Sequence, residues 1–178
     1  LGINLFDTAV GYCGGDSQRV VGEAFEGMRE KVVLSTKNHH YDKDDKDGWW
    51  KHLHDSLERL RTDYIDIYNH HGINWNRFQD SVQGEDGLYK EMLEAKDQGL
   101  IRHICFSFHG PEEHLINLVD TGLFDTVICQ YNLLDRRLED AIAHASECGM
   151  GVLIMGPVGG GRLGYPSDKA ASLVGEVK

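Results

Sequence analysis

The chain has 178 residues, the length of one ordinary domain, and a formal net charge of −11. An acidic surface repels the phosphates of nucleic acids and the headgroups of anionic membranes, so neither is an expected partner. No apolar run reaches the roughly 20 residues of a membrane span, and no secretory signal pattern opens the sequence. We therefore expect a cytoplasmic protein. None of the four cysteines forms a CxxC pair, which predicts buried free thiols and no metal site.

Short apolar stretches rich in Ile and Val alternate with stretches of helical period along the chain. This alternation predicts βα units and a parallel sheet. The expected strands cover residues 2–8, 32–36, 64–69, 102–107, 126–131 and 151–155. The expected helices begin near residues 17, 49, 88, 111 and 138, and Ser17 is expected to cap the first of them. A long loop with Trp75 and Phe78 is expected after the third strand.

Six βα units of similar length fit both a doubly wound sheet and a TIM barrel. No GxGxxG motif follows the first strand, which disfavours the doubly wound alternative. We predict an α/β protein with a TIM (β/α)8 barrel, of which this chain holds about six of the eight units. Residues 1–178 are expected to form a single partial barrel domain, and the start at Leu1 indicates a fragment.

Polar side chains end successive predicted strands, and three of them, Asp7, Lys37 and His71, end the first three. Because neighbouring strands lie about 4.8 Å apart, these groups would converge on one patch. Tyr12, five residues after Asp7, could fold back over it. A phenol beside an ammonium suits proton donation to a carbonyl oxygen during hydride reduction, and the ammonium should lower the phenol pKa. His70 competes with His71 for the place in this patch.

Short blocks of the sequence, in the same order along the chain, resemble the aldo-keto reductase family. They are Gly2–Ala9 with Tyr12, Ser35–Lys37, Ser56–Tyr68, Gly99–Arg102 with Phe106 and Ser107, and Gln130–Asn132. Counting along the third block places the family's catalytic histidine at His71. The stretch Ser107–His109 and the loop Met155–Gly161 resemble a branch whose members often add a C-terminal ferredoxin-like segment.

This resemblance implies a TIM barrel and an NADPH-dependent oxidoreductase that moves hydride between a nicotinamide and an aldehyde, ketone or alcohol. It implies that Tyr12 is the general acid, assisted by Lys37, Asp7 and His71. Ser107 and Gln130 match the positions that hold the nicotinamide carboxamide. The other expected cofactor contacts are His109, Met155, Gly156, Pro157, Gly159, Gly160 and Gly161, with the glycines presenting backbone amides to the pyrophosphate.

Two positions depart from the family pattern. Phe108 replaces an Asn, and Met155 replaces the Tyr that stacks on the nicotinamide, so a thioether stands where the family has a flat ring. Two alternatives to a reductase also remain open. One is a nucleotide-binding regulatory subunit on the same fold, and the other is an inactive partial barrel with exposed sheet edges.

Overall fold

A computed structural model describes residues 2–165 of the chain, and the rest of the predicted domain lies outside the described residues. Six parallel strands form one sheet in the order in which they occur along the chain. They are β1 (Leu5–Asp7), β2 (Val33–Asn38), β3 (Ile65–Ile73), β4 (Ile101–Phe108), β5 (Thr126–Gln130) and β6 (Gly151–Met155). This order is that of a barrel. It excludes the doubly wound alternative, in which the strand order reverses within the sheet.

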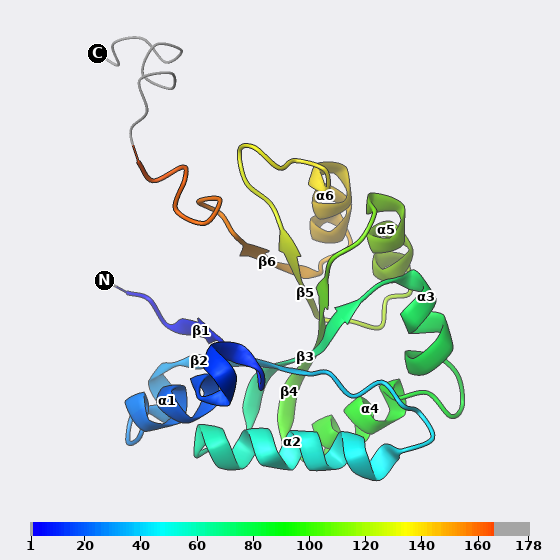
Figure 1. Cartoon of the computed structure of the whole chain (residues 1–178). Helices are drawn as coiled ribbons and strands as arrows, with labels where there is room; N and C mark the ends of the chain where they lie inside the picture. The colour runs from blue at the N-terminus through cyan, green and yellow to red at the C-terminus, as the bar shows by residue number, and fades with distance from the viewer. Residues whose placement is uncertain (1, 166–178) are drawn as a thin grey trace.

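Helices connect the strands and lie on the outer side of the curled sheet, which has the shape of a half-barrel (Figure 1). They are α1 (Ser17–Ala24), α2 (Lys46–Leu60), α3 (Trp75–Arg77), α4 (Tyr89–Asp97), α5 (Glu112–Asp120) and α6 (Glu139–Glu147). Two 3₁₀ turns, η1 (Tyr12–Gly15) and η2 (Arg29–Lys31), and a π-helical turn, η3 (Phe78–Val82), complete the described elements. None of the helices described in residues 2–165 has the length and apolarity that a membrane span needs.

Helix α2 shows how the sequence pattern produces the outer layer. Leu53, Leu57 and Leu60 repeat at helical spacing and are nearly inaccessible to solvent, because this face packs on the sheet. The helix begins three residues earlier than predicted, at Lys46, because the Asp45 side chain accepts a hydrogen bond from the Gly48 amide at 3.0 Å and caps it.

The segment after β3 was expected to be a loop, and that expectation is wrong. It folds into α3 and η3, with the Asn74 side chain accepting a hydrogen bond from the Arg77 amide at 3.0 Å. Phe78 and Val82 are buried in the core. Burial of these side chains stabilises a helical turn that has no strong periodic signal in the sequence.

Two smaller expectations also need correction. Ser17 is the first residue of α1, but its hydroxyl bonds the Thr8 hydroxyl at 2.7 Å and makes no cap, because Thr8 approaches it from the end of β1. Of the cysteines, Cys105 and Cys129 are buried free thiols, whereas Cys13 and Cys148 are exposed. Cys13 lies in η1 and Cys148 just after α6, outside the layer between the sheet and the helices that buries the other two.

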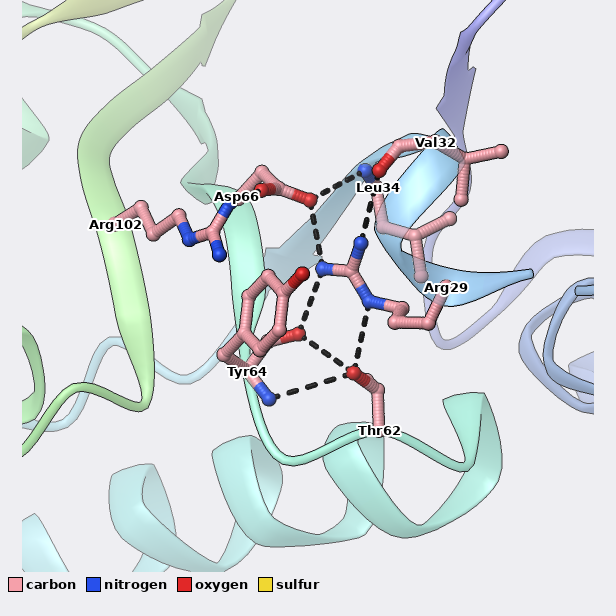
Figure 2. A network of polar contacts seen from close by, with 7 residues as sticks. All are labelled: Arg29, Val32, Leu34, Thr62, Tyr64, Asp66 and Arg102. Carbon is pink, nitrogen blue, oxygen red and sulfur yellow. Dashed lines mark hydrogen bonds and ion pairs between the residues drawn. The ribbon is translucent and has the colours of Figure 1, made fainter. Parts of the chain in front are cut away.

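A charged network joins the beginnings of β2, β3 and β4 (Figure 2). The Asp66 carboxylate accepts hydrogen bonds from Arg29 at 2.6 Å, from the Leu34 amide at 2.9 Å and from Arg102 at 2.8 Å. Both guanidinium groups also lie against the Tyr64 ring, 3.9 and 3.8 Å from its centroid. The network therefore holds three strands together at the end of the sheet opposite to the predicted catalytic residues.

Candidate active site

The four predicted catalytic residues lie together at the carboxyl ends of β1, β2 and β3. Asp7 is the last residue of β1, Lys37 is near the end of β2, and His71 is in the last third of β3. Tyr12 is the first residue of η1, where its amide donates a hydrogen bond to the Ala9 carbonyl at 3.2 Å. This tight turn after β1 brings the phenol back over the strand ends, as predicted.

Lys37 is the buried cation of the patch, with a side chain only 1% exposed. Its ammonium donates to the Asp7 carboxylate at 2.5 Å and to the Thr8 carbonyl at 2.8 Å. Ser35 donates to the other Asp7 oxygen at 2.6 Å and so orients this carboxylate. Burial lowers the Lys37 pKa, and the charge and hydrogen bond of Asp7 oppose that shift.

The Tyr12 ring lies over this ion pair, with its centroid 5.1 Å from the Lys37 ammonium nitrogen. Partial burial, followed by the negative charge of Asp7, raises the Tyr12 pKa. The expectation that the ammonium lowers this pKa is therefore wrong. The physical reason is that Asp7 balances the charge of Lys37 at close range, which leaves burial as the dominant influence on the phenol.

The two adjacent histidines have very different surroundings. The His71 ring is half-buried and lies edge-on to the Tyr12 ring, with 6.3 Å between the centroids. Burial and the Lys37 charge lower its pKa. His70 is fully buried, neither ring nitrogen has a hydrogen-bond partner among residues 2–165, and burial lowers its pKa to about 3. His71 is thus the histidine beside the phenol, and its catalytic role stays a prediction.

The predicted cofactor contacts lie at the ends of β4, β5 and β6. Ser107 is buried in β4, and its hydroxyl accepts a hydrogen bond from the Gly72 amide at 2.7 Å. Gln130 ends β5 opposite Met155, the last residue of β6. Gln130 lines two cavities, of about 450 and about 400 Å³, one on the side of His109 and the other on the side of Gly156.

The cavities separate the predicted cofactor contacts into two groups. Those that line one or both are His109, Gln130, Gly156, Gly159 and Gly160, and those that line neither are Ser107, Met155, Pro157 and Gly161. Arg137 lines the first cavity and Arg162 the second, and both were missed from the sequence. Both arginines lie in loops without a periodic pattern. Their positions in the loops that follow β5 and β6 are the one feature of the sequence that indicates a binding role.

The glycine-rich loop after β6 is wound into consecutive turns. The Gly159 amide donates to the Gly156 carbonyl at 2.9 Å, and the Gly161 amide donates to the Val158 carbonyl at 3.0 Å. Gly159, Gly160 and Gly161 all have positive φ, between 58° and 91°, which glycine adopts without strain. The expectation that these glycines present their amides to the pyrophosphate is therefore wrong for Gly159 and Gly161, because the turns use these two amides internally.

A curled parallel sheet with its ionisable groups at the strand carboxyl ends defines a (β/α)-barrel protein with its site at the usual end of the barrel. The model of the Aldo/keto reductase family matches residues 1–174, and the chain belongs to this family. An uncharacterized oxidoreductase of Bacillus subtilis is 32% identical, over 96% of this chain and 57% of the relative. The NADH-specific methylglyoxal reductase of Escherichia coli is 31% identical, over 79% of this chain and 48% of the relative.

Solved structures agree with this assignment. An aldo-keto reductase from Bacillus halodurans, in its holo form, superposes with a TM-score of 0.76 at 32% identity, over 94% of this chain and 57% of that one. An aldo-keto reductase from Klebsiella pneumoniae, solved with NADP and acetate, has a TM-score of 0.74 at 27% identity, over 96% and 61% of the two chains. The chain thus spans between 48% and 61% of the length of these relatives.

Proposed function

We propose that this chain carries the proton-donating site of an NADP(H)-dependent aldo-keto reductase that acts on a small aldehyde, ketone or alcohol. The observation that carries the proposal is the convergence of Asp7, Tyr12, Lys37 and His71 at the carboxyl ends of three adjacent strands. The relative from Klebsiella pneumoniae, which was solved with NADP, supports the choice of cofactor.

The arrangement suits reduction of a carbonyl. When bound, the nicotinamide supplies the hydride that reduces the carbonyl carbon, and the oxygen then needs a proton. The Tyr12 hydroxyl gives that proton. Its raised pKa keeps the phenol protonated at neutral pH, and the Lys37 ammonium offsets the repulsion between Asp7 and the phenolate that remains. His71 is neutral at this pH because its pKa is lowered, and its ring N–H orients the carbonyl oxygen.

In this proposal the dinucleotide lies along the two cavities that Gln130 lines. The Gln130 side-chain amide offers both a donor and an acceptor to the nicotinamide carboxamide, and it lies between the two cavities. Arg162 and the Gly160 backbone line the second cavity, where a cation and a close backbone approach suit a phosphate. Met155 and Ser107 adjoin this region through β6 and β4.

The proposal is tested by fluorescence titration with NADPH and by aldehyde-dependent NADPH oxidation. The variant is Lys37→Met, which keeps the length of the buried stem and removes the charge. We expect the parent and Lys37→Met to bind NADPH alike and turnover to fall by about 10²–10⁴-fold in Lys37→Met, because the phenolate would then face the uncompensated charge of Asp7. The matched control is Lys43→Met, an exposed lysine in the loop before α2, which should leave both readings unchanged.

Each other outcome has a definite meaning. NADPH binding without turnover in the parent would favour the regulatory nucleotide-binding alternative. Absence of NADPH binding in the parent would contradict a cofactor site in this chain. Equal turnover in the parent and Lys37→Met would remove Lys37 from the mechanism.

A further inference from the structure

Three side chains of metal-ligand type meet on the outer helical layer, away from the catalytic patch. Asp120 is the last residue of α5, His144 is in the last turn of α6, and Cys148 follows that helix directly. Both helices end where β5 and β6 begin, so the cluster is at the end of the sheet opposite to Asp7 and Lys37. Figure 1 shows α5 and α6 as neighbours on the outside of the sheet.

The ligand atoms are close together and accessible. The His144 Nε2 atom is 2.7 Å from an Asp120 carboxylate oxygen and 3.8 Å from the Cys148 sulfur. Each residue contributes one ligand atom, and these three atoms all lie within 4.8 Å of one another. His144 and Cys148 are four residues apart, which places both on one face of α6.

We propose that Asp120, His144 and Cys148 bind a divalent metal ion of the zinc type, with water in the fourth position. The sequence predicts no metal site, because the cysteine spacing resembles no zinc motif and Asp120 comes from another helix. His144 and Cys148 supply two ligands at the end of α6, and the folded chain brings Asp120 to them as the third.

The ligand set is one that zinc prefers. A thiolate, an imidazole and a carboxylate are the three kinds of protein ligand that Zn²⁺ takes in tetrahedral sites. Bond lengths of about 2.0–2.3 Å place tetrahedral ligand atoms about 3.4–3.6 Å apart. The nitrogen–sulfur distance of 3.8 Å is already close to that value. The His144–Asp120 hydrogen bond must open by roughly 0.7 Å, which the 56% exposed Asp120 side chain can do by rotation.

The surroundings favour a cation as well. The last carbonyl groups of α5 and α6 carry partial negative charge, and both helices end at this cluster. A bound ion would therefore neutralise two helix ends and link α5 to α6 across the surface. Such a link stabilises the folded chain, because the unfolded chain does not hold the three ligands together.

The test is a titration of the whole chain with Co²⁺, followed by absorbance. Cobalt takes zinc-type sites, and a cobalt–thiolate bond gives a charge-transfer band in the near ultraviolet. We expect one equivalent of Co²⁺ to produce this band in the parent and an equivalent of Zn²⁺ to abolish it. We also expect the band to be absent in Cys148→Ser, and affinity to be at least about tenfold weaker in His144→Gln and Asp120→Asn.

The matched control is Cys13→Ser, which removes the other exposed cysteine and should keep the band. Burial raises the pKa of Cys105 to about 12 and that of Cys129 to about 11, so these two thiols are neutral and enclosed. Circular dichroism verifies that each variant is folded. Absence of the band in the folded parent, its loss in Cys13→Ser, or its persistence in Cys148→Ser would overturn the proposal.

Discussion

At the scale of single residues, burial shifts the pKa values of the candidate site more than nearby charges do. Burial is the largest influence on Lys37, on Tyr12 and on both central histidines. It lowers the pKa of each base and raises the pKa of the acid, because a low dielectric disfavours the charged form. The result is a neutral phenol and a neutral imidazole around one cation that Asp7 holds in place.

His70 supplies a stability prediction at this scale. Its pKa is about 3 in the folded chain and about 6.5 when unfolded, so the unfolded state binds more protons between these values. Stability is therefore unaffected above the unfolded pKa and falls as the pH drops from about 6.5 toward 3. When this difference in bound protons is integrated from pH 7 to pH 5, His70 accounts for a loss of about 2 kcal/mol in the free energy of unfolding.

Urea unfolding of the parent and His70→Leu at pH 7 and pH 5 measures this effect. Leucine fills a similar volume and does not titrate. Between pH 7 and pH 5, the free energy of unfolding of His70→Leu should therefore fall by about 2 kcal/mol less than that of the parent. The control His54→Leu replaces an exposed histidine on α2 and should follow the parent. An equal pH dependence in the parent and His70→Leu would show that His70 is not the acid-sensitive group.

At the scale of elements, the sheet is held at both of its ends by polar groups that join neighbouring strands. At the carboxyl ends, Asp7 of β1 contacts Ser35 and Lys37 of β2. At the opposite end, Asp66 of β3 contacts Arg29 and Arg102. The Asp7 and Asp66 carboxylates both contribute to stability, because Lys37 and Arg29 would otherwise keep an uncompensated charge at largely buried positions.

We expect Asp66→Asn to destabilise the chain by about 3 kcal/mol, the lower end of the range for a broken buried ion pair. Arg29 would keep its charge with a side chain only 16% exposed, whereas Arg102 is 53% exposed and would regain water. Denaturant unfolding measures the loss. Asp55→Asn, which breaks the surface pair with Lys51 on α2, is the control and should cost at most about 1 kcal/mol. Equal effects of the two variants would contradict a structural role for this network.

At the scale of the whole molecule, the described sheet is a half-barrel with β1 and β6 outermost. Within residues 2–165, β1 pairs with β2 and β6 pairs with β5, and β1 and β6 do not pair with each other. Within the described part of the chain, each outer strand therefore presents backbone donors and acceptors that can pair with another chain. The Ile154 side chain in β6 is 37% exposed, which adds apolar surface at this edge.

We expect this 178-residue chain to self-associate as its concentration rises, through these outer strands. Size-exclusion chromatography with light scattering measures the mass. Ile154→Lys should reduce association, because a lysine on an edge strand opposes pairing. The control Val20→Lys changes a residue on α1 that is 60% exposed and should have no such effect. A mass that stays that of one chain at every concentration would contradict the expectation.

Several features of this protein follow from the sequence by itself, because they depend on residues close together in the chain. Alternating apolar and helical periods determine the six strands and the main helices, within a few residues at each boundary. The polar residues that end strands, such as Asp7, Lys37 and Gln130, follow from the same pattern. Parallel strands in chain order then bring those residues to one end of the sheet.

Other features depend on the tertiary structure alone, because distant segments or burial decide them. The direction of the Tyr12 pKa shift required the distance between Lys37 and Asp7. The cluster of Asp120 with His144 joins residues 24 positions apart on two helices. No local pattern encodes a contact of this kind, because it arises only when the sheet sets α5 beside α6.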